Sequence, residues 1–189
     1  MVIPYIIGGG VLYGALSERY AIPYTPNVTE LPNLMNKVED NVKKAAFQQA
    51  LELIETEEGF KDTVYLDTLG YPTVGWGHKV LPEDGLKLGD KISIEKAKQF
   101  LAKDLNAAFD AAVLQANECG KFNSYFIARL TSVNYQLGIY WRTKFPNTWS
   151  YIKAGNLPAL KSALYNSAWY KQTPNRVIAF YSDLETYLA

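Results

Sequence analysis

The stretch from residue 47 to residue 78 constrains the fold most, because its pattern changes abruptly at one glycine. Up to Glu58, apolar residues recur at spacings of three and four, which predicts an amphipathic helix. Gly59 follows directly, as glycines do at helix ends. Beyond it, apolar runs at 64–66 and 71–76 flank a short turn sequence. This pattern predicts a strand, a tight turn and a second strand.

The predicted chain reversal brings two carboxylates toward each other. Glu58 lies at the predicted helix end, and Asp67 lies at the end of the first predicted strand. Glycosidic hydrolysis needs such a pair, because one acid protonates the leaving oxygen while a second carboxylate activates water or stabilises the oxocarbenium-like transition state. Thr73 adds a hydroxyl six positions after Asp67, on the returning strand. These three residues are the candidate catalytic groups.

The spacing Glu-x8-Asp-x5-Thr, followed by Val-Gly-Trp-Gly-His, closely resembles the phage-type lysozymes, the endolysin family of the T-even bacteriophages. Residues 93–114 resemble the long helix that joins the two lobes in that family. Residues 135–138 resemble its aromatic-Gln-x-Gly motif, and residues 167–176 resemble its late Trp-Tyr-x-Gln-Thr-Pro-Asn-Arg signature. The resemblance covers about residues 46 to 189, with the motifs in the right order.

The resemblance implies an α+β, lysozyme-like fold in which a small antiparallel β-sheet lobe is joined by a long helix to a mainly helical lobe. It implies a muramidase that cuts the bond between N-acetylmuramic acid and N-acetylglucosamine in peptidoglycan. Glu58 would be the general acid, Asp67 the ionised partner and Thr73 the group that holds the attacking water, with inversion at the anomeric carbon. Glu57 is interpreted as a bystander, because its spacing to Asp67 is wrong and no glycine follows it.

Four more residues are expected near this site. By resemblance, Arg176 pairs with Glu58, and Gln136 either contacts the sugar or Glu58 or is merely a helix-surface glutamine. His78 is tempting as a catalytic base, but a structural ion pair with Asp104 is the preferred interpretation. Such a pair should raise the pKa of His78.

Two other functions fit parts of the sequence. A lytic transglycosylase would use the acid without a hydrolytic water, so Asp67 and Thr73 both argue against it. A structural virion or tail component could use a lysozyme-like domain for wall binding or assembly. Because Glu58, Asp67 and Thr73 are all present, retained activity is the expectation even in that case.

The composition limits the kinds of partner and cofactor that we expect for this protein. The 189 residues contain 19 acids and 19 bases, so no excess of positive charge points to nucleic acid. Cysteine and histidine occur once each, as Cys119 and His78, which is too few for a zinc cluster or an internal disulfide. We therefore expect no metal and no cofactor, and bacterial peptidoglycan is the expected partner.

The N-terminal region is expected to be an appendage. Residues 1–19 are apolar, but their uncharged stretch is shorter than the roughly 20 residues of a spanning helix. They could be a membrane signal anchor, a docking segment for a virion or tail, or an arm packed on the catalytic domain. Residues 20–45 read as a proline-containing linker and helical extension, and residues 46–189 as the catalytic domain. The expected location is the phage virion or the host cell envelope.

Overall fold

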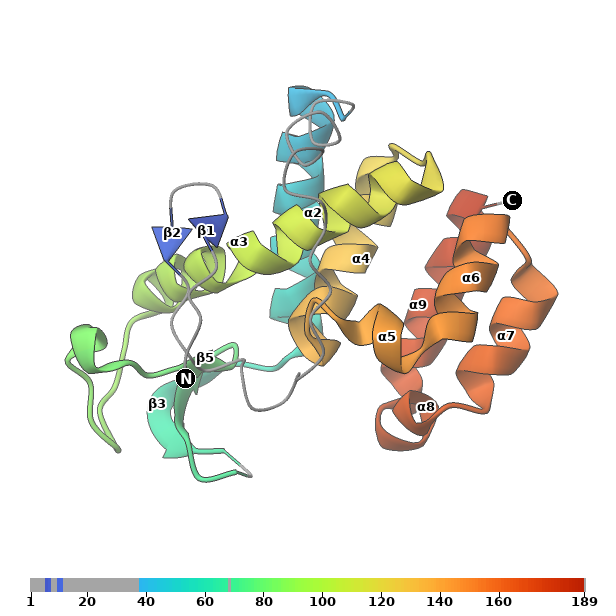
Figure 1. Ribbon diagram of the computed structural model, residues 1–189. Coiled ribbons are helices and arrows are strands. Elements are labelled where there is room, and N and C mark those ends of the chain that lie inside the picture. The colour runs from blue at the N-terminus through green and yellow to red at the C-terminus, as the bar shows by residue number, and fades with distance from the viewer. Residues whose placement is uncertain (1–5, 8–9, 12–37, 68, 189) are drawn as a thin grey trace.

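The computed structural model describes residues 6–7, 10–11, 38–67 and 69–188 (Figure 1). Most of the expected anchor or docking segment and of the linker therefore lies outside the described residues. Within that region, β1 (Ile6–Ile7) and β2 (Gly10–Val11) form an antiparallel pair. No helix in the described ranges is long and apolar enough to cross a membrane.

A three-stranded antiparallel sheet and a set of helices make up the remainder. The sheet has the order β3-β4-β5, and a short 3-10 helix, η1, follows it. The strands and η1 are β3 (Lys61–Leu66), β4 (Pro72–Gly75), β5 (His78–Lys79) and η1 (Pro82–Asp84). The helices are α2 (Asp40–Glu57), α3 (Ile94–Cys119), α4 (Ser124–Leu137), α5 (Trp141–Lys144), α6 (Pro146–Ala154), α7 (Leu157–Tyr165), α8 (Ala168–Gln172) and α9 (Pro174–Leu188). The predicted α+β class is confirmed.

The long helix α3 joins the sheet to the helical lobe, as the sequence led us to expect (Figure 1). It begins at Ser93, whose hydroxyl accepts a hydrogen bond from the Lys96 N–H at 3.2 Å, and it ends at Gly120 in a left-handed conformation. Near its start, Phe100 packs against the sheet residues Val64 and Val74. Farther along, α3 packs against α4, so one rigid element fixes the sheet relative to the helices.

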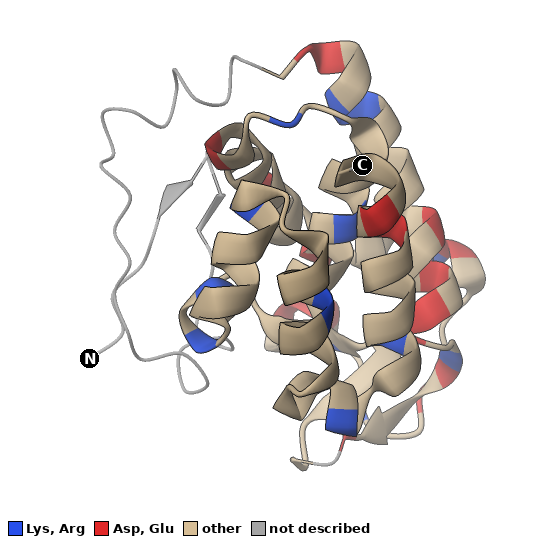
Figure 2. Cartoon of the chain, turned by 90° about the vertical axis from the view of Figure 1, so that its right-hand side faces the viewer, with Lys and Arg blue, Asp and Glu red and all other residues tan. Residues whose placement is uncertain are grey.

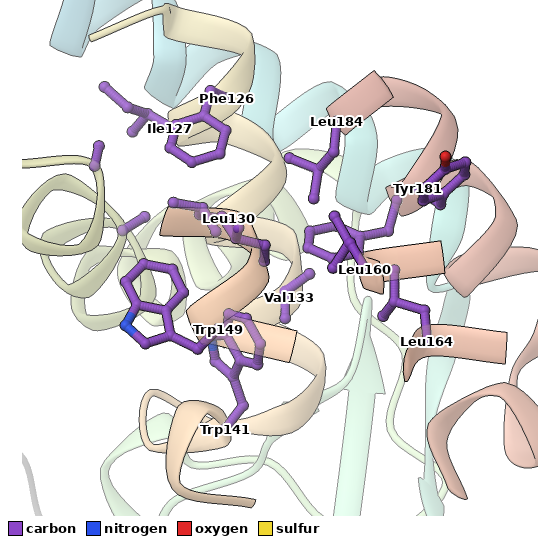
Figure 3. Close-up of a cluster of buried hydrophobic side chains, with 14 of the residues drawn as sticks. Phe126, Ile127, Leu130, Val133, Trp141, Trp149, Leu160, Leu164, Tyr181 and Leu184 are labelled. Atoms are coloured by element: carbon purple, nitrogen blue, oxygen red, sulfur yellow. The ribbon is translucent and has the colours of Figure 1, made fainter. Parts of the chain in front are cut away.

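The main core lies in the helical lobe around α4 (Figure 3). Trp141 is fully buried and meets the Trp149 ring edge-on, with ring centroids 5.8 Å apart. Side chains from α4, α7 and α9 close around these rings, and Figure 3 shows them converging from separate helices. This core is the base that holds the start of α9 in place.

The chain between residues 141 and 154 forms two helices, α5 and α6, because Pro146 disfavours a helical conformation in the residue before it. Accordingly, Phe145 adopts φ −125° and ψ 58°.

The beginning of α2 locates part of the expected helical extension. The helix runs unbroken from Asp40 to Glu57, so residues 40–45 are continuous with the helix that ends beside Glu58. Val38, just before it, is 1% exposed and belongs to the main core. Residues 38–45 are thus packed with the domain.

This packing predicts a loss of stability in Val38→Ala. Removing two buried carbon atoms should lower the free energy of unfolding by about 1–3 kcal/mol in urea denaturation. The matched control is Leu88→Ala, since Leu88 is 61% exposed and its truncation should change stability by less than about 0.5 kcal/mol. Equal stabilities for the two variants would show that residues before α2 contribute nothing to the folded unit.

Candidate active site

Glu58 is placed by the way α2 ends. Its N–H still donates to the Ile54 carbonyl at 3.0 Å, so Glu58 is the C-terminal cap of the helix. Gly59 then adopts φ 69°, a left-handed conformation that glycine reaches without a steric penalty. The chain turns away into β3 at once. The carboxylate is thereby presented where the helix meets the sheet.

Asp67 is held by the turn that it closes. One oxygen, Oδ1, accepts hydrogen bonds from the N–H groups of Leu69 at 2.8 Å and Tyr71 at 2.9 Å. The Asp67 N–H also donates to the Tyr71 carbonyl at 2.9 Å. An aspartate that bonds to the backbone a few residues ahead stabilises such a turn. These backbone hydrogen bonds therefore fix the orientation of the Asp67 carboxylate.

The sheet register places Thr73 on the same face as two neighbours. Tyr65 in β3 and Lys79 in β5 lie directly opposite Thr73 in β4. Residues directly opposite in an antiparallel sheet share a face. Thr73 is 4% exposed, and its hydroxyl donates to the Tyr71 carbonyl at 3.0 Å. Asp67, two residues beyond Tyr65, continues this row because side chains alternate along an extended chain.

Tyr65 lies close to both candidate carboxylates. Burial raises the pKa of Tyr65, and the negative charges of Asp67 and Glu58 raise it further. The side chain that faces Thr73 across the sheet therefore also lies within electrostatic reach of the helix-end acid and of the turn acid.

Arg176 forms the expected ion pair with Glu58. Its Nη1 lies 2.7 Å from Glu58 Oε1, and the Glu58 side chain is 26% exposed while that of Arg176 is 12% exposed. Arg176 projects from the first turn of α9, which begins at Pro174. Hydrogen bonds between charged groups are stronger than neutral ones, so this contact holds the first turn of α9 against the end of α2.

Glu57, whose spacing does not fit the role of the acid, makes several polar contacts. Its Oε1 pairs with the Arg129 guanidinium, and its Oε2 accepts from the Ser132 hydroxyl at 2.7 Å and lies 3.2 Å from Arg176 Nε. Four acids lie between residues 52 and 58, and Figure 2 shows acidic residues gathered on one side of the molecule. Arginines from two other helices balance this charge at the end of α2.

Sequence reasoning missed Arg129, although a signal was present. Arg129 is 5% exposed within a helix whose residues 126–134 are all buried. A cation in such a run needs an opposite charge, since an unpaired buried charge is strongly destabilising. Arg129 meets this need with Glu57 on one side and Asp183 on the other.

Gln136 links three helices. Its amide Nε2 donates to the Thr173 hydroxyl at 3.2 Å, and its Oε1 accepts from the Trp169 indole N–H at 3.0 Å. Beside it, the Tyr135 hydroxyl donates to the Trp76 carbonyl at 2.9 Å. Gln136 thus holds Thr173, the residue directly before α9, which carries Arg176 in its first turn. A direct sugar contact stays a prediction.

His78 joins two aspartates and contacts no candidate catalytic group. Its Nδ1 lies 2.7 Å from Asp104 Oδ2, the expected pair, and its Nε2 lies 2.9 Å from Asp84 Oδ2. The ring is buried and stacks on Phe100 with centroids 3.9 Å apart. Asp84, which sequence reasoning did not identify, also accepts from the Leu81 N–H at 2.7 Å. The two aspartates tie β5, η1 and α3 together.

The surroundings of His78 determine the direction in which its pKa is shifted. Burial lowers the pKa of His78, but hydrogen bonds and the charges of Asp104 and Asp84 outweigh burial, so the pKa is raised. Burial raises the pKa of Asp84, but the Leu81 N–H and His78 outweigh it, so this pKa is lowered. Both ring nitrogens face carboxylates, which favours the doubly protonated imidazolium.

The described residues offer little support for nucleophilic catalysis by cysteine or for metal binding. Burial, with the nearby charge of Glu118, raises the pKa of the half-buried Cys119 thiol to about 12, so it is a poor nucleophile. In the part of the chain that the structure describes, no group of three or more His, Cys, Asp or Glu residues is arranged to hold a metal ion.

The His78 cluster predicts a pH-dependent loss of stability in His78→Asn. A raised histidine pKa stabilises the fold fully below the unfolded value of about 6.5, and this stabilisation is lost as pH rises through the folded pKa. The lowered Asp84 pKa stabilises the fold above about pH 4 and is lost as pH falls through its folded value. Urea unfolding should show the largest deficit between about pH 4 and 6.5. A deficit that is equal at pH 5.5 and pH 9 would contradict this assignment.

Comparisons with known proteins agree with the motifs. The family model described as phage lysozyme matches residues 55–179. The peptidoglycan hydrolase gp36 of Pseudomonas phage phiKMV is 34% identical over 139 residues, which are 74% of this chain and 15% of that protein. The pre-baseplate central spike protein Gp5 of Enterobacteria phage T4 is 24% identical over an alignment of 163 residues that covers 72% of this chain and 28% of that protein. This chain thus covers less than a third of either relative. Because the family model spans more than half of the chain, and includes Glu58, Asp67, Thr73 and Arg176, the protein belongs to the phage lysozyme family.

Proposed function

We propose that this protein is a phage-encoded muramidase that hydrolyses the bond between N-acetylmuramic acid and N-acetylglucosamine in peptidoglycan. The observation that carries the proposal is the position of Glu58 at the end of α2, paired with Arg176 and directly before β3, whose residue Tyr65 lies opposite Thr73 in the sheet. The name of the phiKMV relative, a peptidoglycan hydrolase, supports the same substrate.

Glu58 serves as the general acid in this proposal. It gives its proton to the glycosidic oxygen as the bond breaks, and it becomes a carboxylate in the same step. Arg176 Nη1, 2.7 Å away, interacts more strongly with the carboxylate than with the neutral acid. An interaction that strengthens as the proton leaves lowers the barrier. Arg176 therefore stabilises the charge that develops during catalysis.

Asp67 and Thr73 act on the water. The Thr73 hydroxyl hydrogen is directed to the Tyr71 carbonyl, so its oxygen is oriented to accept a hydrogen bond from a water. Asp67, fixed by two backbone N–H groups, is the base that takes the water proton. With the acid on one side of the sugar and the water on the other, the reaction inverts the anomeric carbon, as the family resemblance implies.

The assignment of the acid predicts that Glu58→Gln is inactive. Wild-type enzyme should release products with reducing-end muramic acid from purified peptidoglycan, detected by mass spectrometry. The variant should be about 100- to 10,000-fold slower, the usual contribution of a general acid. Glu55→Gln is the matched control, since Glu55 lies on the same turn of α2 but pairs with Lys98 at 3.5 Å. Anhydro-muramic products from the wild type would point to a transglycosylase instead.

The role of Thr73 predicts a difference between two substitutions. Thr73→Val keeps the shape of this buried side chain but removes the hydroxyl, so kcat should fall about 10- to 100-fold through loss of water positioning. Thr73→Ser keeps the hydroxyl and should retain most activity. Steady-state rates on soluble glycan fragments would measure both, and equal rates for the two variants would remove Thr73 from the mechanism.

A role within the phage particle is a second candidate. The observation that favours it is the similarity to a phage T4 protein named as a pre-baseplate central spike, which covers 72% of this chain. In this proposal residues 1–19 dock the enzyme into the virion or tail, so that it acts during entry. Sedimentation of purified particles, followed by detection of this chain, tests the idea. Recovery of the chain with host membranes alone would favour anchoring at the cell envelope and action at lysis.

A further inference from the structure

Arg176 is held by more than its contact with Glu58. Its Nε lies 3.2 Å from Glu57 Oε2, and its Nη2 donates to the Ser132 hydroxyl at 2.9 Å and to the Ser132 carbonyl at 3.4 Å. The third nitrogen, Nη1, is the one that meets Glu58. Because the guanidinium is planar and rigid, fixing two of its nitrogens also fixes the direction of the third.

Glu57 is itself anchored on its other side. Arg129 pairs with Glu57 Oε1 and with Asp183 Oδ2, and the Ser132 hydroxyl donates to Glu57 Oε2. The Glu57 side chain is 12% exposed and that of Arg129 only 6% exposed. Charged groups from α2, α4 and α9 therefore form one partly buried assembly, in which Glu57 contacts both arginines.

The two adjacent glutamates share one arginine but differ in environment. Glu58 is about twice as exposed as Glu57, 26% against 12%, and makes a single ion pair with Arg176. Glu57 has three partners. Its charge offsets part of the positive charge of Arg176, and it also lies beside Glu58 as a like charge. Glu57 therefore competes with Glu58 for the charge of Arg176.

We infer that Glu57 is a positioning residue, which orients Arg176 toward Glu58 and shares the positive charge of Arg176 with it. This inference rests on the proposed function, since it assigns how the acid of that same site is tuned. Glu57 does not touch the substrate in this account. It acts through Arg176.

The pH–rate profile tests the inference. In full-length Glu57→Gln, Arg176 keeps its full charge for Glu58 and the neighbouring like charge is gone. The basic limb of kcat/KM should therefore move down by about 1 pH unit, which lowers the rate about tenfold on that side of the optimum. KM should change little. Glu57→Asp restores the charge and should bring the limb back toward its wild-type position.

A matched control and a second variant keep the test decisive. Glu55→Gln removes the same charge from the same helix outside this assembly and should leave the limb unmoved. If Glu57→Gln does not fold because Arg129 is left unbalanced, Glu57→Gln/Arg129→Gln removes opposite charges together and should show the same limb shift.

Two results would overturn the inference while leaving the proposed function intact. The first is wild-type muramidase activity with an unmoved limb in a folded Glu57→Gln. The second is failure of both the single and the double variant to fold, which would assign Glu57 to stability alone. A wild-type enzyme that releases no muramic acid products would instead overturn the proposed function itself.

Discussion

The contact between Arg176 and the end of α2 is the interaction on which the site depends. It joins residues 118 positions apart in the chain, and it brings the first turn of α9 against the helix that presents Glu58. The start of α9 is prepared for this contact by Gln136, which holds Thr173 and Trp169. The acid is thus presented by a local glycine stop but oriented by a distant helix, and both parts are needed for a defined geometry.

The sheet lobe is fixed independently of this contact. His78 links Asp84 near η1 to Asp104 on α3, and Phe100 stacks under the imidazole. One face of the sheet is therefore occupied by structural contacts, while the opposite face carries the row of Tyr65 and Thr73 that leads to Asp67. The contacts of His78, the only histidine in the sequence, thus lie on the face of the sheet opposite Tyr65 and Thr73.

Short-range sequence patterns predicted some of the elements that form the site. The change of period at Gly59 depends on neighbouring residues, and the structure confirms it. By contrast, Asp84 and Arg129 acquire their partners only when distant elements pack, so spacing gave no indication of them. The partners of Glu57 were equally hidden, because they come from α4 and α9. A lone arginine in an apolar helix was the one sign that a buried acid must exist elsewhere.

The doublet Glu57-Glu58 shows how one cation can serve opposing requirements. An arginine beside a general acid stabilises the carboxylate that catalysis produces, but the same charge opposes the protonated form with which catalysis begins. Burying a second carboxylate against that arginine weakens its pull before proton transfer, without removing the hydrogen bond that is needed afterwards. The cost of burying Glu57 is offset because Arg129 and Ser132 saturate its oxygens. Two adjacent identical residues thus differ in role solely through the partners that tertiary packing gives them.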